Sequence, residues 1–228
     1  MKEKKFEYLI VGAGPAGMFA CFELLKKVDG KKIALFDMGS RLEERKPSEV
    51  MTGFGGAGTY SDGKLHYTPK LSHERTFHLI DPDDYQKILN EVEKIFTDFG
   101  VDSEYFPKNE DEVEMLVAEA EKNDVELVVR RAQHVGTDKL KEVVAKFQKY
   151  LLDKGVTLFD RTEIKDLLID KNVTTGVVDK KGNKYFGKKV LLVPGRVNAT
   201  WLQNIGKKHG IKYQYDMVEI GVRVEFPR

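Results

Sequence analysis

The chain has 228 residues, of which 41% are hydrophobic and 33% are charged, and its formal net charge is +1. This near balance of charge excludes a general electrostatic affinity for nucleic acid or for anionic membranes. The single cysteine, Cys21, excludes an intramolecular disulfide and a cysteine-based metal site, and it favours a reducing, cytoplasmic setting. No apolar stretch approaches the roughly 20 residues that cross a bilayer. We therefore expect a soluble, cytoplasmic protein without nucleic-acid or membrane partners.

The first 37 residues predict a strand, a helix and a second strand. Aromatic and β-branched residues at 7–11 end at Gly12, helical spacing extends over 15–28, and a second apolar strand occupies 32–36. These elements fill about the 30 residues of a βαβ unit. A right-handed crossover makes its two strands parallel neighbours.

The rest of the chain alternates between helical and extended patterns. Helical spacing predicts helices over 81–96, 110–123, 137–152 and 199–208. Apolar or alternating runs predict strands over 125–130, 156–159, 163–170, 174–179, 190–193 and 220–226. The glycine-rich stretch 53–63 is too polar for a core element and predicts a flexible loop. This order of elements indicates an α/β domain with an insertion.

Residues 12–17 read Gly-Ala-Gly-Pro-Ala-Gly, a G-x-G-x-x-G motif between a predicted strand and a predicted helix. In a dinucleotide-binding turn the first glycine permits a tight turn, the second lets the backbone approach a pyrophosphate, and the third lets helix and strand pack closely. Asp37, 20 residues after Gly17, can accept a hydrogen bond from a ribose hydroxyl. The motif therefore predicts a dinucleotide site, and the alternative is a glycine-rich turn that binds no ligand.

A second match to the same pattern lies at 53–58, but no strand leads into it and no helix follows it. We interpret it as a loop whose amides, together with the Ser61 hydroxyl and the Lys64 ammonium, can close on a polar or anionic ligand.

Four further runs are more specific: GGAGTYSDGKL at 55–65, HVGTDKL at 134–140, LLVPGR at 191–196 and GVRVEFP at 221–227. With the first glycine motif, Asp37 and Arg45, they resemble the uncharacterised FAD-dependent dehydrogenases among the flavoproteins with two dinucleotide-binding domains. The resemblance implies a Rossmann-like FAD-binding domain, in which a parallel sheet with helices is joined to a β meander, and an FAD-dependent oxidoreductase activity.

The resemblance also implies which residues contact FAD. It places residues 14–17 at the pyrophosphate, Asp37 at the adenosine ribose, the 55–64 loop near the isoalloxazine and ribityl portion, and 163–164 at the adenine. The implied cofactor-binding residues are Gly12, Ala13, Gly14, Pro15, Ala16, Gly17, Asp37, Met38, Arg45, Gly55, Gly56, Ser61, Asp62, Gly63, Lys64, Glu163, Ile164, Pro194, Gly195 and Arg196.

A division into four segments follows from the resemblance. Residues 1–66 and 134–213 would form the FAD-binding domain, 67–133 a mainly helical insertion, and 214–228 the first strand of a truncated substrate domain. Because such flavoproteins are longer, we expect a fragment that binds FAD weakly and self-associates through an exposed C-terminal strand. The substrate and the electron donor, for which NAD(P)H is one candidate, are left open.

Two other functions stay open, a non-catalytic binding module and an NAD(P)-dependent Rossmann enzyme. We predict no metal site, because the spacing of the histidines at 66, 73, 78 and 134 fits no standard set of ligands. Cys21 is predicted to be buried and inert, and Trp201 to belong to the core. Lys64 is either a cation that stabilises reduced flavin or an exposed loop lysine.

Overall fold

A computed structural model describes residues 4–68, 80–213 and 222 of the chain. The strands are β1 Lys4–Val11, β2 Ile33–Phe36, β3 Lys64–His66, β4 Tyr105–Phe106, β5 Ala132–His134, β6 Thr157–Phe159, β7 Ile164–Asp170, β8 Val173–Asp179 and β9 Lys184–Leu192. The α-helices are α1 Pro15–Leu25, α2 Pro82–Asp98, α3 Glu110–Glu121, α4 Thr137–Asp153 and α5 Ala199–His209. Short 3₁₀ helices are η1 Gly30–Lys32, η2 Leu42–Glu44, η3 Ala57–Tyr60 and η5 Arg196–Asn198.

A six-stranded sheet in the order β6-β2-β1-β9-β8-β7 forms the centre of the fold. β1 is parallel to both β2 and β9, and β2 is parallel to β6. β8 and β7 continue the sheet from β9 as an antiparallel meander. The predicted βαβ unit is confirmed, as is the α/β class with a mainly parallel sheet and a β meander.

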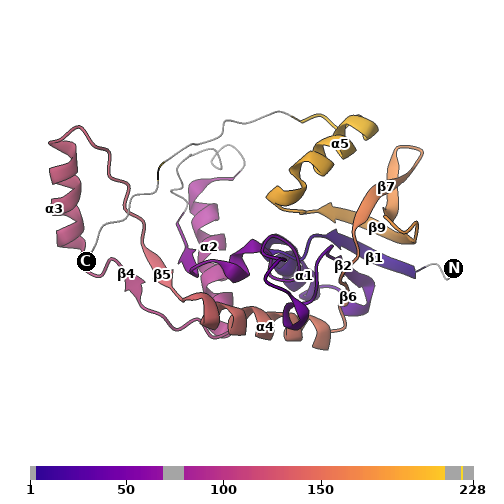
Figure 1. The fold of residues 1–228 in the computed structure, drawn as a ribbon, viewed down its shortest axis with the longest axis horizontal. Helices are drawn as coiled ribbons and strands as arrows, with labels where there is room; N and C mark the ends of the chain where they lie inside the picture. Colours follow the sequence, from indigo (N-terminus) through magenta and orange to yellow (C-terminus); the bar gives the residue numbers. More distant parts are fainter. Residues whose placement is uncertain (1–3, 69–79, 214–221, 223–228) are drawn as a thin grey trace.

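The side chains of β2 alternate between two hydrophobic clusters, one on each face of the sheet, and all four are buried. Ile33 and Leu35 join the cluster formed with α1 and α4, whereas Ala34 and Phe36 join the cluster formed with the meander and α5. Figure 1 shows α4 below the sheet and α5 above it. Burial on both faces explains why β2 is a continuous apolar run instead of an alternating one.

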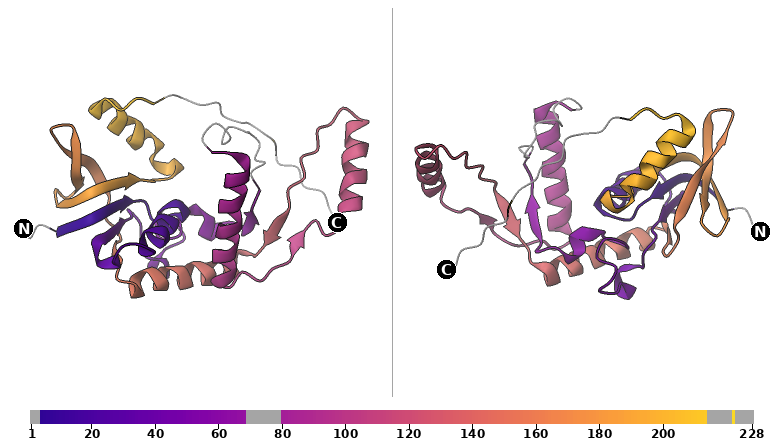
Figure 2. Two further views of the ribbon diagram at one scale, coloured as in Figure 1. Left: turned by 180° about the vertical axis from the view of Figure 1, so that it is seen from behind. Right: turned by 45° about the horizontal axis from the view of Figure 1, so that its top comes forward.

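The section between β3 and α4 contains a small antiparallel sheet in the order β3-β5-β4. Helix α2 joins this section to the main core through aromatic contacts, with Phe96 against Phe19 at 5.3 Å and Phe99 stacked on Phe147 at 4.5 Å between ring centroids. Helix α3 lies at the end of the molecule farthest from the six-stranded sheet in every view (Figures 1 and 2). Its side chains contribute no buried residue.

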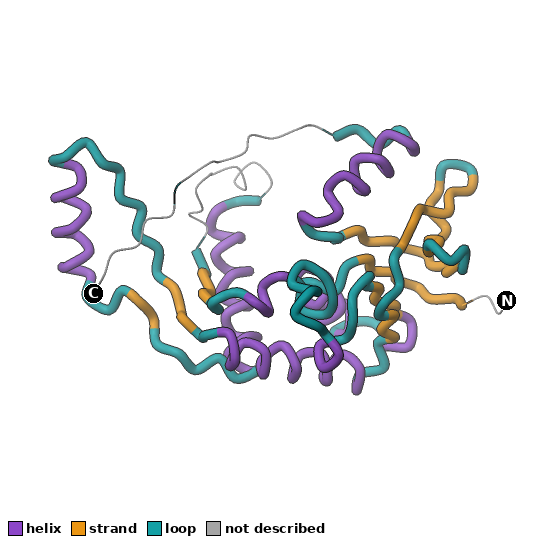
Figure 3. The backbone as a smooth tube through the Cα atoms, in the orientation of Figure 1, coloured by secondary structure: helices purple, strands orange, loops and turns teal. Residues whose placement is uncertain are grey.

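The predicted strand over 125–130 is wrong. This segment has no assigned secondary structure and appears as part of a long loop between α3 and β5 in Figure 3. Val125, Val128 and Val129 are exposed, and the short strand β5 begins only at Ala132. A run of β-branched residues favours extended backbone but becomes a strand only where a neighbouring strand supplies hydrogen bonds.

The expectation that 53–63 is a loop outside the core is also wrong. Phe54 is 1% exposed and Thr59 is 0% exposed, and both lie against the sheet and α4 side of the molecule. The stretch forms η3, and its backbone hydrogen bonds include one from Gly55 N to Ala13 O at 2.9 Å. A glycine-rich segment can be buried when other parts of the chain satisfy its backbone groups.

Three expectations lie outside the described residues, apart from Val222: the strand over 220–226, the segment 214–228, and the histidines at 73 and 78. The division into domains stays a prediction. Among the residues that are described, no helix combines the length and the apolar character needed to cross a membrane.

Candidate dinucleotide-binding groove

The turn between β1 and α1 exposes backbone at the carboxyl end of β1. Gly12 has a φ of +111°, and a Cβ there would lie 2.2 Å from the Val193 carbonyl oxygen. A Cβ on Gly17 would lie 1.9 Å from the Gly12 carbonyl oxygen, so these two glycines are required by packing. A Cβ on Gly14 would meet only the Gly56 Cα, at 3.9 Å. Gly14 therefore keeps the backbone open toward the space in front of the turn.

Helix α1 begins at this turn without a side-chain cap. Its N-cap is Gly14, and Pro15 occupies the first helical position. The first-turn amides consequently have no side-chain acceptor, and the helix dipole adds partial positive charge at the same place. Such a helix start is suited to bind the oxygens of a phosphate group.

Asp37, the residue that follows β2, connects three segments of backbone. One carboxylate oxygen accepts a hydrogen bond from Ala13 N at 2.9 Å, and the other accepts from Gly39 N at 2.8 Å and Gly53 N at 2.7 Å. The side chain thus fixes the first glycine turn relative to the second glycine loop. This structural role is additional to the ligand contact predicted from sequence.

Arg45 fixes the second glycine loop from its other side. Its guanidinium donates to the carbonyl oxygens of Phe54 at 2.9 Å and Gly56 at 3.0 Å, and to that of Glu49 at 2.6 Å. The same group lies over the Tyr60 ring, 4.6 Å from its centroid. Arg45 therefore supports the loop from behind.

The chain after β9 forms a third wall. Val193 N donates to Val11 O at 2.8 Å, which extends the pairing of β9 with β1 to the strand end. Gly195 then turns the chain with a φ of +68°, and η5 and α5 follow. The Asn198 amide approaches Met38 Sδ at 3.4 Å across the gap.

These walls enclose a cavity of about 680 Å³ and a smaller pocket of about 40 Å³. Both are lined by Gly12, Asp37, Met51, Pro194 and Val197, so they form one continuous groove across the carboxyl ends of β1, β2 and β9. Strand β1 has its parallel neighbours on both sides here, and ligands bind at such a point in open α/β sheets. The volume of the larger cavity is within the range of small-molecule sites.

The larger cavity contains the start of α1 and the second glycine loop. Besides the shared residues, it is lined by Gly14, Pro15, Ala16, Gly53, Gly56, Ala57, Gly58, Leu192, Val193, Gly195, Arg196, Ala199 and Leu202. Arg196 is exposed and makes no ion pair with any carboxylate of the described residues. This end of the groove therefore combines backbone amides with the guanidinium of Arg196, which forms no ion pair with a described residue.

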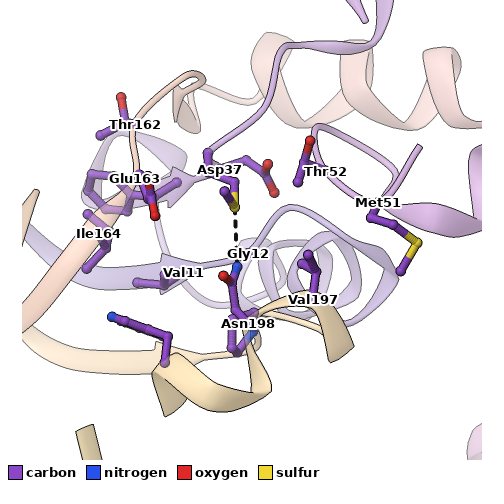
Figure 4. A pocket seen from close by; sticks show the side chains of 14 residues that line it. Val11, Gly12, Asp37, Met51, Thr52, Thr162, Glu163, Ile164, Val197 and Asn198 are labelled. Carbon is purple, nitrogen blue, oxygen red and sulfur yellow. Dashed lines mark hydrogen bonds between the residues drawn. The ribbon is translucent and has the colours of Figure 1, made fainter. Parts of the chain in front are cut away.

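The smaller pocket lies beyond Asp37. Figure 4 shows Asp37 between Thr162 and Glu163 on one side and Met51 and Thr52 on the other. Trp201 also lines this pocket, and its ring nitrogen donates to Lys165 O at 2.9 Å. The partly buried indole packs against the second hydrophobic cluster, so Trp201 lies at the edge of the core predicted for it and also reaches the groove.

The structure separates the predicted site residues into three groups. Those that line the groove are Gly12, Gly14, Pro15, Ala16, Asp37, Met38, Gly56, Glu163, Ile164, Pro194, Gly195 and Arg196. Those that support it without lining it are Ala13, Gly17, Arg45 and Gly55. Those that lie outside its lining are Ser61, Asp62, Gly63 and Lys64.

Lys64 belongs to β3 and pairs with Asp62 at 2.9 Å, and its side chain is 53% exposed. This ion pair lowers the pKa of Asp62 through the Lys64 hydrogen bond. Of the two readings left open by the sequence, the geometry favours the exposed loop lysine.

Several lining residues were not predicted, namely Met51, Thr52, Thr162, Val197, Asn198, Trp201 and Leu202, whereas Ala57 and Gly58 belong to the 55–64 loop that was predicted to approach the ligand. Thr162, Val197 and Asn198 each follow closely on the carboxyl end of a strand. Their position after a strand was the sequence signal that could have placed them in the groove, because the carboxyl ends of parallel strands meet at one edge of the sheet. Met51 and Thr52 reach the groove only because Asp37 holds the neighbouring Gly53 amide, which no local pattern reveals.

Cys21 is buried within the first cluster, and burial raises the pKa of its thiol to about 12. The predicted burial of Cys21 is confirmed, and a raised thiol pKa agrees with the predicted low reactivity. Within the described ranges, no group of three or more histidine, cysteine, aspartate or glutamate side chains is placed to hold a metal ion.

Several solved structures resemble this fold. They include an L-amino acid deaminase from Proteus vulgaris, with 15% identity over 90% of this chain and a TM-score of 0.56. An L-proline dehydrogenase from P. horikoshii has 16% identity over 93% of this chain and a TM-score of 0.54. A glycine oxidase from Bacillus cereus ATCC 14579 has 19% identity over 88% and a TM-score of 0.53. The chain shares their α/β fold.

The chain spans 51%, 58% and 58% of the length of these three proteins, respectively. No protein-family model matches the sequence, and no curated protein matches it. These likenesses concern the fold, and they agree with the α/β class predicted from the sequence.

Proposed function

We propose that the chain is the FAD-binding part of an oxidoreductase. The observation that carries the proposal is the continuous groove from the uncapped start of α1, past Asp37, to the pocket at Thr162 and Trp201. An elongated groove with an anion site along its length suits two nucleotide halves joined by a pyrophosphate. The amino-acid oxidase, dehydrogenase and deaminase neighbours support a redox function, and the sequence motifs support FAD as the dinucleotide.

The residues present fit such a ligand. The absence of a side chain at Gly14 leaves open backbone beside the larger cavity, where a Cβ would have no neighbour closer than 3.9 Å. The amides at the start of α1 would hold the pyrophosphate, and the uncommitted Arg196 guanidinium would offset its charge. Asp37 has about four acceptor positions, and three accept backbone amides. One position remains for a single ribose hydroxyl.

FAD supplies hydride and electron transfer when it is bound. In this proposal the chain's own residues orient the dinucleotide: Asp37 and the pocket at Ile164 hold the adenosine half, and the η3 loop covers one side of the groove and excludes water. The substrate and an electron donor such as NAD(P)H belong to the same proposal. We also place the protein in the cytoplasm, on the ground that its one cysteine is a buried, inert thiol.

NAD is the second candidate, because the same turn and the same carboxylate suit its adenosine half. NADP is disfavoured, because its 2′-phosphate would face the Asp37 carboxylate at close range. Comparing the affinities for NAD and NADP thus tests whether the groove discriminates against a ribose 2′-phosphate.

Calorimetric titration of the flavin-free chain with FAD, NAD and NADPH tests the proposal. We expect FAD to bind most tightly and Gly14→Val to weaken FAD binding by about tenfold or more, because the branched side chain would fill the space beside Gly56. Lys64→Met is the matched control, since Lys64 is outside the groove lining, and it should bind FAD as the unchanged chain does.

Thermal unfolding of each variant separates loss of binding from loss of fold. Gly14 has a φ of −73°, which a side chain tolerates, so its unfolding midpoint should stay near that of the unchanged chain. Gly14→Ala serves as a second variant if Gly14→Val does not fold. Tighter binding of NADPH than of FAD, or unaltered FAD affinity in a folded Gly14→Val, would contradict the proposal.

A further inference from the structure

The segment between α3 and β5 is an exposed apolar stretch at the end of the molecule far from the groove. Val125 is 54% exposed, Leu127 is 40% exposed and Val128 is 55% exposed. The backbone of residues 126–130 makes no hydrogen bond with any described residue. Exposed β-branched residues together with unpaired backbone groups are a template for strand addition.

The charges of this segment are arranged symmetrically about Val128. Glu126, two residues before it, is exposed, and Arg130, two residues after it, is half-buried with its Nε buried and without a hydrogen-bond partner. Neither forms an ion pair with a described residue. In an antiparallel pair, residues at equal distances on either side of a common centre are placed opposite each other. Two copies paired about Val128 would therefore bring Glu126 of each copy opposite Arg130 of the other.

The apolar residues Leu127 and Val129 are also placed symmetrically about Val128. Leu127 of one copy would face Val129 of the other, and both would lie on the face opposite the charged pairs because side chains alternate along a strand. Such a contact is isologous, since the same segment serves as both partners. This self-complementarity of charge and of apolar side chains favours a second copy over an unrelated partner.

We propose that residues 126–130 form a two-fold antiparallel strand pair with the same residues of a second copy of this chain. The contact differs from the self-association expected of the C-terminal strand, because it uses the segment before β5. Figures 1 and 2 place the segment at the opposite end of the molecule from the six-stranded sheet, so the pairing leaves the dinucleotide-binding groove accessible. The proposal does not depend on which cofactor the groove binds.

Charge exchange tests the pairing in the 228-residue chain. Sedimentation equilibrium over a range of concentrations should show a monomer–dimer equilibrium. Glu126→Lys should weaken it by about tenfold, because each of two symmetric ion pairs becomes a repulsion. Arg130→Glu should weaken it similarly, and the double variant Glu126→Lys/Arg130→Glu should restore dimerisation.

Glu114→Lys is the matched control, because Glu114 lies on the exposed α3 outside the paired segment and should leave the dimer unchanged. Circular dichroism checks that each variant is folded. A chain that stays monomeric at all concentrations would overturn the proposal, and so would a dimer insensitive to the single charge changes. A chain that stays monomeric would mean that the segment is covered within one chain. A dimer insensitive to the charge changes would assign the contact to another surface.

Discussion

The groove region and the inserted section each contain a short apolar run, which is buried in the first region and exposed in the second. In the groove region, glycine-rich turns are held by Asp37 and Arg45 and lie against a sheet buried on both faces. In the inserted section, an apolar run of similar length remains exposed, and α3 buries no residue. Burial follows from what the rest of the chain supplies to a segment more than from the hydrophobicity of the segment itself.

The difference also separates two ways of organising backbone. Around the groove, several backbone amides and carbonyls near the glycines are satisfied by Asp37 or Arg45, which come from elsewhere in the sequence. Between α3 and β5, backbone groups lack such partners among the described residues. Removing a hydrogen-bonding partner around the groove should therefore lower the free energy of unfolding much more than removing a side chain between α3 and β5.

The largest contrast is expected between two apolar truncations. Phe147 is 0% exposed and contacts Phe19, Phe22 and Phe99. Phe147→Ala should lower the free energy of unfolding by about 4 kcal/mol through lost contacts and a residual cavity. Leu116 on α3 is 61% exposed, and Leu116→Ala should change stability by less than about 0.5 kcal/mol. Urea unfolding measures both, and equal costs would mean that α3 is packed in solution.

Removing the carboxylate of Asp37 should be the next most damaging change. Asp37→Ala leaves the amides of Ala13, Gly39 and Gly53 without their acceptor, and we expect a cost of about 3 kcal/mol. Asp62→Ala removes an exposed ion pair with Lys64 and should cost at most about 1 kcal/mol. If both variants unfold at the same urea concentration, the carboxylate does not hold the two glycine loops together.

A pair of glycine substitutions tests the close approach of backbone in the groove region. Gly17→Ala places a methyl group 1.9 Å from the Gly12 carbonyl oxygen, and the required shift of α1 should cost about 2 kcal/mol. Gly58→Ala has no atom within 4 Å of the new Cβ and should be neutral in stability. Thermal unfolding of the two variants distinguishes a packed turn from a loose one.

Local pattern was sufficient for elements whose environment is set by neighbours in sequence. The βαβ unit, the first glycine turn and the helices at 81–96 and 137–152 were predicted because periodicity and glycine spacing act over a few residues. The exposed state of 125–130 and the burial of Phe54 could not be predicted in this way. Both depend on distant partners: a missing strand in one case, and Arg45 and Asp37 in the other.

The residues of the candidate groove also fall into those that a local sequence pattern predicts and those that depend on distant parts of the chain. The glycines of the first turn and Asp37 carry a sequence pattern, and they line or support the groove as a set. Lys64 and Ser61 were drawn from the continuation of the second glycine loop, but that loop turns away at η3 into β3 and carries them out of the groove lining. Trp201 reaches the groove through the packing of α5 on the sheet, which only the tertiary structure defines.

The smallest expected effect concerns how α5, and with it Trp201, is fastened over the groove. Asp166 on β7 accepts hydrogen bonds from His209 at 2.8 Å and from Lys208, both at the end of α5. Burial alone would raise the pKa of Asp166, but these two partners and the Leu167 amide together bring it below its ordinary value.

Because the folded-state pKa of Asp166 is lower than the unfolded one, its contribution is complete above about pH 4 and is lost as the pH falls through the folded-state value. We expect about 1 kcal/mol of stability to disappear as the pH falls below about 4. Fluorescence of Trp201, the single tryptophan, reports this locally during urea unfolding. Asp166→Asn should remove this part of the pH dependence, whereas Asp98→Asn, which breaks an exposed pair with Lys94, should retain it. An identical pH profile in Asp166→Asn and the unchanged chain would show that α5 is held over the groove by its apolar contacts alone.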